Sequence, residues 1–366
     1  MSNDFIPAAK PLVGKEEQRA VDAVLASGMM AQGPQVAAFE EEFSAQMVDG
    51  AFCAAVNSGT SALHLGLLAS GIGPGDEVIV PSFTFAATAN SVAITGASPV
   101  FADIELDYFC LDPKHVEEQI TEKTKAIMPV HLYGHPANMT TLREIADKHG
   151  LQLFEDAAQA HGATLNGQPV GTFGTFGAFS FYPTKNMTSG EGGMITTRDE
   201  KVLHNAKKLR NQGMEQRYAN DLVGLNNRMT DIHAAIGREQ LKKVGAWTKT
   251  RQANAKFLSD NIEGVVTPKV AEGATHVYHQ YTIKIASDRD GFQQALKDEY
   301  NIGSGVYYPI PNHRLPSLEK YAPGLDLPNT ETAAKQCLSL PVHPSLSQED
   351  LERIVNAVNT LAKAGA

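Results

Sequence analysis

The sequence predicts an α/β protein with a mostly parallel central sheet flanked by helices, followed by a smaller C-terminal α+β domain. Short apolar runs alternate with longer helical stretches through the first 200 or so residues, which is typical of strand–helix units. After Asn226 this alternation stops and one long helical pattern begins. Because such units place helices on both faces of a parallel sheet, we expect ligands beyond the carboxyl ends of its strands.

The N-terminal part is expected to contain an arm over residues 1–13 and two amphipathic helices, Lys15–Leu25 and Gln35–Phe43, separated by Gly28 and Gly33. The strands of the sheet are expected at Val78–Val80, Pro99–Ala102, Ala126–Val130, Leu151–Phe154, Ala178–Phe181 and Met194–Ile195. Helical stretches between them are His115–Thr121, Met139–His149 and Glu200–Arg210.

A long helix from Asp231 to about Phe257, with Thr230 or Asp231 as its N-cap, is expected to link two domains. We assign residues 1–245 to the large domain and residues 246–366 to the small one. The small domain is expected to contain strands near Val277–Ile285 and Gly305–Tyr308 and helices near Phe292–Glu299 and Gln348–Ala362.

Composition excludes several classes of partner. The chain has 366 residues and a net charge of −10, with no basic run, which argues against nucleic acid as a ligand. No apolar run reaches the ~18 residues that a membrane span needs, and the first residues do not resemble a secretory signal. Cys53, Cys110 and Cys337 are widely spaced and form no Cys-x-x-Cys pair. We therefore expect a cytoplasmic protein without a membrane partner.

The segment Phe179–Met194 places one lysine, Lys185, between an aromatic strand and a glycine-rich turn. A desolvated or cation-flanked lysine can lose its proton near neutral pH and attack a carbonyl, which is how pyridoxal phosphate is held as a Schiff base. A solvated surface lysine is the alternative, and it is the commoner case for lysines in general. Lys185 alone does not decide between them, so the other parts of a cofactor site are needed.

A phosphate site is the second part. The segment Val56–His64 places a turn with Ser58, Gly59 and Thr60 directly before an apolar helix, so that free amides and the positive helix end would face an anion. An ordinary N-cap without a ligand has the same composition. The chain has no Walker loop and no Gly-x-Gly-x-x-Gly fingerprint, which disfavours the nucleotide-binding enzymes of those types.

An acid is the third part. Asp156 follows an apolar strand, and a carboxylate there can keep a pyridine nitrogen protonated; a structural strand-end cap is the alternative. We expect only one of Glu155 and Asp156 to act, the other being a solvated neighbour. Gln159 is placed to reach the ring hydroxyl of such a cofactor, or else to bind the backbone. In Pro81–Ala86, one of Phe83 and Phe85 could stack on the ring.

Two other kinds of site are disfavoured. His131 and His135 have the spacing of metal ligands on a helix, but Gly134 and Pro136 are incompatible with that helix, so no metal site is expected. A serine hydrolase has no support, because Gly-x-Ser-x-Gly is absent and Ser180 has no neighbouring histidine.

Several ordered motifs together resemble the DegT/DnrJ/EryC1/StrS family of pyridoxal-phosphate-dependent sugar aminotransferases, which have fold type I. They are Ser-Gly-Thr-Ser-Ala-Leu, Pro-Ser-Phe-Thr-Phe, Glu-Asp-Ala-Ala-Gln, Ser-Phe-x-x-x-Lys-x-x-x-x-Gly-Glu-Gly-Gly and Gly-Leu-Asn-Asn-Arg-Met. The similarity extends from Gly33-Pro34 to Leu340-Pro341. An ordered set of this length is far more specific than any single motif.

The resemblance implies a role for each matching residue. Lys185 matches the Schiff-base lysine, Asp156 the acid on the pyridine nitrogen and Gln159 the partner of the ring hydroxyl. The remaining matches are phosphate ligands (Gly59, Thr60, Ser180), an aromatic on the ring (Phe85), and an asparagine that reaches the phosphate of the neighbouring subunit in a homodimer (Asn226). Arg228, in the same loop, could present a cation to an anionic substrate. Leu225 and Asn227 differ from many members, which weakens inferences about the sugar.

The resemblance also implies a reaction. An amino donor, usually L-glutamate in this family, would convert the cofactor to its amino form, which would aminate a keto group on a nucleotide-linked sugar. A branch of the family dehydrates sugars and replaces the lysine by histidine; Lys185 is retained here, which favours transamination. The alternatives are another fold type I activity, such as sugar dehydration or aromatic-amine biosynthesis, or a non-catalytic regulator. An unrelated two-domain α/β protein is a further alternative.

Overall fold

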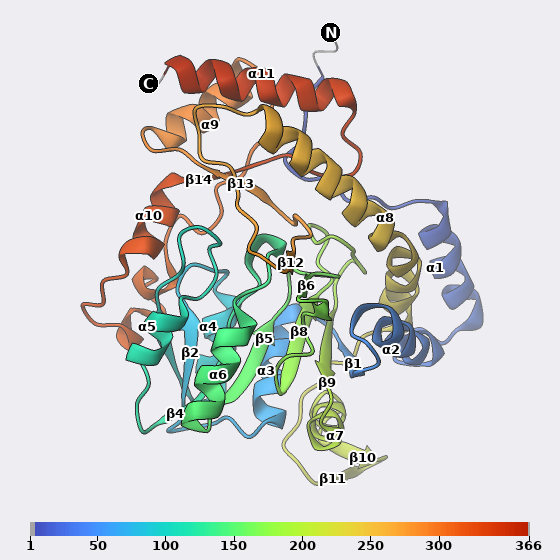
Figure 1. Ribbon diagram of the computed structural model, residues 1–366. Helices are drawn as coiled ribbons and strands as arrows, with labels where there is room; N and C mark the ends of the chain where they lie inside the picture. The colour runs from blue at the N-terminus through green and yellow to red at the C-terminus, as the bar shows by residue number, and fades with distance from the viewer. Residues whose placement is uncertain (1–3, 365–366) are drawn as a thin grey trace.

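The computed structural model describes residues 4–364, and its centre is a seven-stranded sheet with helices on both faces (Figure 1). In spatial order the strands are β1 (Phe52–Val56), β9 (Gly193–Thr197), β8 (Phe176–Ser180), β5 (Gln152–Asp156), β4 (Thr124–Ile127), β2 (Glu77–Pro81) and β3 (Ser98–Ala102). Strand β9 runs antiparallel to both of its neighbours, whereas the pairs from β8 to β3 are parallel. The predicted mostly parallel sheet is confirmed, and β1 is a strand that the sequence analysis missed.

Both faces of the sheet are buried. Along β2, the side chains of Val78 and Val80 belong to one hydrophobic cluster and that of Ile79 to another, because successive side chains of a strand point to opposite faces. The first cluster includes residues of α3 (Gly59–Ala69), α4 (Ala87–Ile94) and α7 (Glu200–Leu209). The second includes residues of α5 (Pro113–Glu118) and α6 (Met139–His149). The predicted helices on both faces are therefore present.

Three helices pack beside this sheet: α1 (Lys15–Ser27), α2 (Pro34–Met47) and the long α8 (Asp231–Asn261). The two candidate caps of α8 have different roles. The Thr230 side chain accepts a hydrogen bond from the His233 amide and is the N-cap of α8. The Asp231 carboxylate instead accepts hydrogen bonds from the amides of Gly33, Gln35 and Val36, and so caps α2. Two adjacent residues, Thr230 and Asp231, therefore cap the N-termini of two different helices.

The C-terminal part contains an antiparallel pair, β13 (Tyr281–Lys284) and β14 (Cys337–Leu340), with helices α9 (Arg289–Asp298), α10 (Pro328–Gln336) and α11 (Gln348–Ala364). The expected strand at Gly305–Tyr308 is wrong. Gly305 makes only an isolated bridge with Ser339, and Tyr308 has a φ of 57°, which takes the backbone out of the extended region. The α+β character of this part is confirmed.

Shorter elements complete the fold. Three two-residue strands form a small sheet, namely β6 (Thr164–Leu165), β7 (Gln168–Pro169) and β12 (Ala274–Thr275). A separate hairpin is formed by β10 (Met214–Gln216) and β11 (Ala219–Asn220), and it lies next to α7 (Figure 1). The 3₁₀ helices are η1 (Leu132–Gly134), η2 (Asn312–Arg314) and η3 (Glu319–Tyr321).

Helix α8 connects two hydrophobic clusters without a break at residues 245 and 246. Leu241 and Val244 pack in the cluster of α2, whereas Ala255 and Leu258 pack in the C-terminal cluster. Ile6 of the N-terminal arm also belongs to the C-terminal cluster and forms a bridge with Ile302. The division at residue 245 stays a prediction, but the arm packs on the C-terminal part.

Within residues 4–364, no helix has both the length and the apolar composition that crossing a bilayer requires. Cys53, Cys110 and Cys337 are buried free thiols. The cytoplasmic location stays a prediction.

Candidate active site

A cavity of about 540 Å³ lies where the carboxyl ends of β2, β5 and β8 meet the segments that follow them. Its lining combines residues from four parts of the chain: Ser58, Gly59, Thr60, Leu63; Thr84, Phe85, Ala87, Val130; Asp156, Ala158, Gln159, Ser180, Tyr182, Thr184, Lys185, Glu191; and His279, Gln280, Tyr307, Tyr308. Seven of the residues predicted from sequence line it: Gly59, Thr60, Phe85, Asp156, Gln159, Ser180 and Lys185. Residues more than 120 positions apart therefore converge on one cavity.

Lys185 lies in the turn after β8, where its amide donates a 2.9 Å hydrogen bond to the Tyr182 carbonyl. Burial lowers the pKa of the Lys185 amine from 10.5 to about 8, and the Asp156 carboxylate acts in the opposite direction. A buried amine with a lowered pKa is the form in which lysine attacks a carbonyl. The surface-lysine alternative does not fit this environment.

Asp156 is the last residue of β5, and its carboxylate faces the cavity. Its Oδ2 accepts a 2.7 Å hydrogen bond from the Thr88 hydroxyl, and its Oδ1 accepts one of 3.2 Å from the Ala158 amide. Burial raises the pKa of Asp156, while these hydrogen bonds and the Lys185 amine oppose that rise. A cationic ring nitrogen in the cavity would oppose it further.

Glu155 is not the solvated neighbour that the sequence analysis expected. Its side chain is fully buried, and the carboxylate accepts hydrogen bonds from three amides, those of Gly171, Phe173 and Gly174. Its Oε2 also lies 3.0 Å from Nε2 of His131. Because Glu155 points to the other side of β5, it anchors the loop before β8 and has no contact with the cavity.

The two histidines that were considered as metal ligands are engaged separately. Nδ1 of His131 accepts a hydrogen bond from the Ala137 amide. The proton of the ring is therefore on Nε2, which donates a hydrogen bond to Glu155. Nε2 of His135 accepts the Ala271 amide, and its Nδ1 lies 2.7 Å from the Pro136 carbonyl. All four ring nitrogens therefore have partners from the protein.

Gln159 has a fixed amide orientation. Its Oε1 accepts a 2.8 Å hydrogen bond from the Tyr133 amide, so its Nε2 must be the atom that lies 2.8 Å from the Tyr308 hydroxyl. One N–H of Nε2 donates to Tyr308, and the second remains available to a ligand. Gln159 therefore presents a hydrogen-bond donor to the cavity.

The turn at Ser58 forms the end of the cavity that can hold an anion. The Ser58 hydroxyl accepts the Ser61 amide and caps α3, while the first amides of the helix, those of Gly59 and Thr60, have no partner within the helix. A Cβ on Gly59 would lie 2.7 Å from Cβ of Ser180, so glycine is required for this close approach. Ser180 is thereby held beside the helix N-terminus.

The two aromatics after β2 have different positions. Phe83 is fully buried and packs edge-to-face against Tyr308, with ring centroids 5.7 Å apart. Phe85 lines the cavity and is 64% exposed. Of the two, only Phe85 lines the cavity, and its role on the ring stays a prediction.

Asn226 and Arg228 do not line the cavity of their own chain. Asn226 pairs with Asn211 in a β-bridge, and Nη1 of Arg228 donates a 2.7 Å hydrogen bond to Oδ1 of Asn211. The predicted roles of both residues involve a second subunit or a substrate, and they stay predictions.

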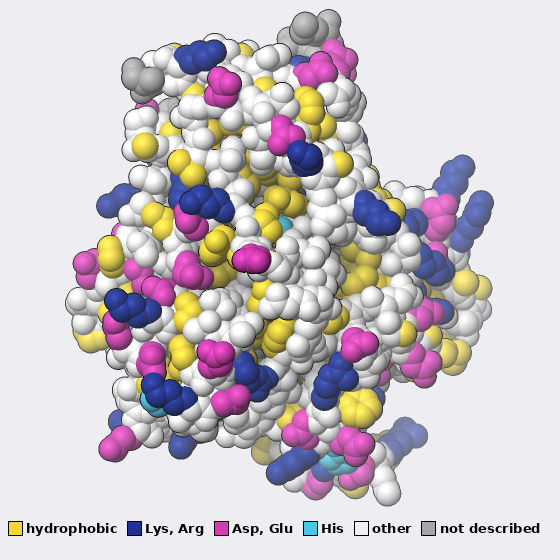
Figure 2. Space-filling model, viewed as in Figure 1, with side chains coloured by type: hydrophobic (Ala, Val, Ile, Leu, Met, Phe, Trp, Pro, Cys, Tyr) yellow, Lys and Arg dark blue, Asp and Glu magenta, His cyan; other side chains and the backbone are white. Residues whose placement is uncertain are grey.

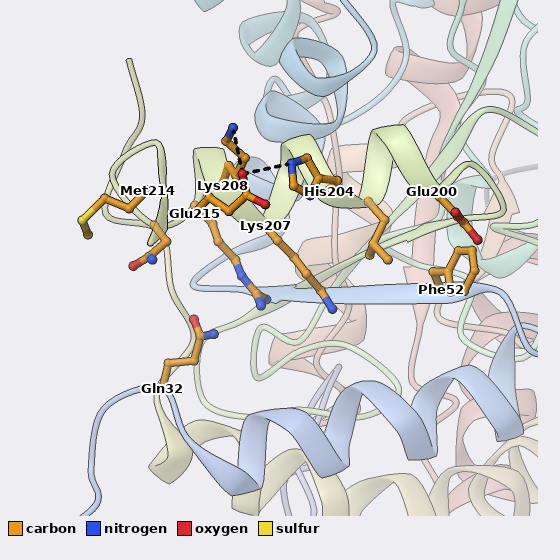
Figure 3. Close-up of a pocket in the computed structure, with 11 residues that line it drawn as sticks. Gln32, Phe52, Glu200, His204, Lys207, Lys208, Met214 and Glu215 are labelled. Atoms are coloured by element: carbon orange, nitrogen blue, oxygen red, sulfur yellow. Dashed lines mark ion pairs between the residues drawn. The ribbon is translucent and has the colours of Figure 1, made fainter. Parts of the chain in front are cut away.

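Figure 3 shows a second hollow, of about 560 Å³, along α7. Several of its charged side chains have partners. Arg210 contacts Glu40 at 2.6 Å, Lys208 contacts Asp221, and His204 lies 3.9 Å from Glu215. None of the predicted site residues lines it. On the face shown in Figure 2, charges of both signs are interspersed. The cavity at Lys185 is therefore the candidate active site.

Sequence reasoning missed several residues of this site. Thr88 orients Asp156, and its position one helical turn after Thr84 gives no signal of that contact. His279, Gln280 and Tyr308 come from the C-terminal part and reach the cavity only through the tertiary fold. No local motif marks such residues.

Comparisons with known proteins identify the family of this chain. The model of the DegT/DnrJ/EryC1/StrS aminotransferase family matches residues 11–359. The chain is 42% identical to a UDP-N-acetyl-3-dehydro-alpha-D-glucosamine 3-aminotransferase of Acidithiobacillus ferrooxidans, over 89% of this chain and 88% of that protein.

Two solved structures are similar over nearly the whole chain. The Streptomyces venezuelae DesV structure, in complex with a ketimine intermediate, has a TM-score of 0.92 and 40% identity, covering 98% of this chain and 99% of that chain. The Bacillus subtilis NtdA structure, with bound cofactor PMP, has a TM-score of 0.88 and 33% identity, covering 95% and 82%. The chain described here belongs to the DegT/DnrJ/EryC1/StrS aminotransferase family.

Proposed function

We propose that this protein is a pyridoxal-phosphate-dependent aminotransferase that transfers an amino group from L-glutamate to a keto group of a nucleotide-linked sugar. The observation that carries this proposal is the convergence of Lys185, Asp156 and the amides at the N-terminus of α3 on one cavity. These groups match an aldehyde, a pyridine nitrogen and a phosphate, respectively. The NtdA structure with bound PMP supports the same cofactor.

Each group of the cofactor has a matching partner in the cavity. The amides of Gly59 and Thr60 and the Ser180 hydroxyl would bind the phosphate. Asp156, oriented by Thr88, would hold the proton on the ring nitrogen, and Gln159 would donate to the ring hydroxyl. Pyridoxal phosphate, when bound, supplies an electron sink for negative charge at the reacting carbon.

Lys185 would carry the proton between the substrate carbon and C4′ of the cofactor. This transfer requires an amine that can both accept and donate a proton near neutral pH, which agrees with the lowering of the pKa of Lys185 to about 8 by burial. Phe85 at the rim would cover the ring face and exclude water from it.

The substrate class is tested with a panel of nucleotide-linked 3-keto and 4-keto sugars. Each sugar is incubated with the holoenzyme and L-glutamate, and amino sugar and 2-oxoglutarate are measured together. The 3-aminotransferase name of the 42% identical relative makes a UDP-linked 3-keto sugar the first compound to test. Equal amounts of both products support the proposal. Formation of neither product with any sugar of the panel would contradict it.

A sugar dehydratase, an enzyme of aromatic-amine biosynthesis and a non-catalytic regulator are the competing functions. The same panel separates them, because a dehydratase would release no 2-oxoglutarate in proportion to sugar consumed. A regulator would show neither cofactor absorption nor turnover. The presence of Lys185 and Asp156 in one buried cavity favours the transaminase.

We also propose a homodimer in which Asn226 contacts the cofactor phosphate of the opposite subunit. The hairpin β10–β11 and the loop after it expose apolar side chains, with Tyr218 at 80% and Val223 at 97%. Exposed apolar side chains gathered in one segment favour a protein contact. Asn226 follows directly in the chain and is exposed, so it is available to a second copy.

Mixed dimers test this arrangement. Lys185→Ala and Asn226→Asp are each expected to be inactive, the second because its carboxylate repels the phosphate. If the site is shared, a heterodimer has one doubly damaged and one intact site, so co-refolded mixtures should regain activity that neither parent shows. No gain in a sample verified to contain folded heterodimer would rule out the shared site.

A further inference from the structure

The Tyr308 hydroxyl accepts a hydrogen bond, but its own proton is not donated to any described residue. Gln159 accepts the Tyr133 amide through Oε1, so its Nε2 donates to Tyr308 and the Tyr308 oxygen is the acceptor of that bond. Among the described residues, the hydroxyl has no other hydrogen-bond partner. Its own O–H is therefore free to donate, and Tyr308 lines the cavity beside Gln159.

Packing holds the Tyr308 ring in one position. Phe83 contacts it edge-to-face at 5.7 Å and 89°, and Tyr133 stacks on it at 6.3 Å and 16°. The φ of 57° at Tyr308 is unusual for a bulky residue, and such backbone conformations are kept only where the surroundings determine them. The hydroxyl is thus presented to the cavity by a rigid aromatic wall.

The protonation state of Tyr308 suits a donor. Burial raises the pKa of its phenol, the hydrogen bond from Gln159 acts in the opposite direction, and the Asp156 carboxylate adds to the rise. The pKa of the phenol is therefore above its ordinary value of 10.0, and the hydroxyl keeps its proton at neutral pH. A neutral hydroxyl donor therefore lies 2.8 Å from the amide donor of Gln159 at the cavity wall.

We propose that Tyr308 is a second hydrogen-bond donor, next to Gln159, to the anionic ring oxygen of the cofactor. This inference rests on the proposed function and deepens it. Two donors stabilise negative charge on that oxygen better than one, which makes the oxygen less basic. The proton shared between the ring oxygen and the nitrogen of Lys185 is then released at lower pH.

The test is a pH titration of the visible absorption of the holoenzyme without substrate. Tyr308→Phe keeps the ring, its packing and its backbone, and removes only the donor. The pKa of the lysine–cofactor linkage should rise by about one unit, the size expected from one hydrogen bond to a charged group. The dissociation constant of pyridoxal phosphate, measured by equilibrium titration, should rise severalfold.

Tyr133→Phe is the matched control. Its ring stacks on Tyr308, it does not line the cavity, and its amide still holds Gln159. The control should leave the pKa of the linkage unchanged. An unchanged pKa in folded Tyr308→Phe, or an equal rise in both variants, would overturn the inference while leaving the aminotransferase proposal intact. A wild-type protein that takes up no cofactor would overturn both.

Discussion

Glu155 and Asp156 are neighbours on β5, yet they belong to two different regions of the molecule. Asp156 faces the cavity with two hydrogen-bond donors, the Thr88 hydroxyl and the Ala158 amide. Glu155 faces the loop before β8, where it binds three amides, and the His131 ring. Because side chains alternate along a strand, the Asp156 carboxylate faces the ligand cavity and the Glu155 carboxylate stabilises a loop of the fold.

The difference between the two regions is how completely each carboxylate is satisfied. Glu155 has four donors, which is close to the number that a carboxylate can accept, so it has no capacity left for a ligand. Asp156 retains unused acceptor capacity towards the cavity, next to Lys185. An incompletely satisfied buried acid is therefore a better sign of function than burial alone.

The largest expected effect concerns the amine that faces Asp156. Lys185→Ala should lower turnover on the order of ten-thousandfold, because the proton carrier is removed. Steady-state rates with L-glutamate and a keto-sugar nucleotide give the value. Lys201→Ala, at an exposed position of α7, is the control and should keep the wild-type rate. Undiminished turnover in Lys185→Ala would remove this residue from the mechanism.

Asp156→Asn tests the catalytic role of the carboxylate that faces the cavity. Loss of the charge beside the ring nitrogen should lower the rate on the order of a thousandfold, as for other electrostatic contributions to catalysis. The fold should hardly change, because the asparagine oxygen can still accept the Thr88 hydroxyl. Rates and urea denaturation measured on one preparation separate the two effects. A near-normal rate would show that another acid serves the ring.

Glu155→Gln tests the structural role of the carboxylate that faces the loop before β8. The glutamine NH₂ would face an amide donor in place of an acceptor oxygen, so the free energy of unfolding should fall by about 3 kcal/mol. Urea denaturation at neutral pH measures this change. The rate of the folded enzyme should fall less than in Asp156→Asn. A larger rate loss with unchanged stability would reverse the assignment of the two acids.

Glu17 provides a third buried acid, with a smaller expected effect. Burial opposes its ionisation, but Lys243, the Gly14 amide and Gln240 together lower the pKa of Glu17 from 4.5 to about 2. A lowered pKa stabilises the fold above about pH 4.5, and this contribution is lost as the pH falls towards 2. Glu17→Gln should therefore cost about 2 kcal/mol at neutral pH and little at pH 2.

Denaturation at several pH values measures this dependence. Glu16→Gln, at the neighbouring exposed carboxylate, is the control and should show almost no change at any pH. A cost of Glu17→Gln that is equal at neutral and acidic pH would show that charge is not the cause.

Much of the fold followed from local patterns. Helix α6 was predicted to the residue, because it combines a regular apolar period with a clear end signal at Gly150. Strand β5 was predicted to within two residues at its ends. Strand β1 was missed because Phe52–Val56 contains two alanines, which have low β propensity. Strand β14 was missed because Cys337–Leu340 follows helix α10 directly, without a turn signal. A strand was expected at Gly305–Tyr308, whereas the backbone of Tyr308 has a positive φ.

The site was predictable where a contact follows from a strand end or a helix start. Asp156 and Gly59 are such residues, and the strand end and the helix N-terminus fix their positions. The residues alone left the choice between Phe83 and Phe85 open, because it depends on the approach of Tyr308 from the C-terminal part, and only the family resemblance indicated Phe85. Contacts between distant segments leave no trace in a local motif.

Covalent attachment of the cofactor tests the central claim most directly. Protein loaded with pyridoxal phosphate is treated with borohydride and digested, and the labelled peptide is sequenced by mass spectrometry. The account predicts a single labelled site at Lys185, with attachment that becomes faster as the pH rises through about 8, the lowered pKa of this amine. Label on another lysine, or equal labelling of Lys185→Ala, would contradict it.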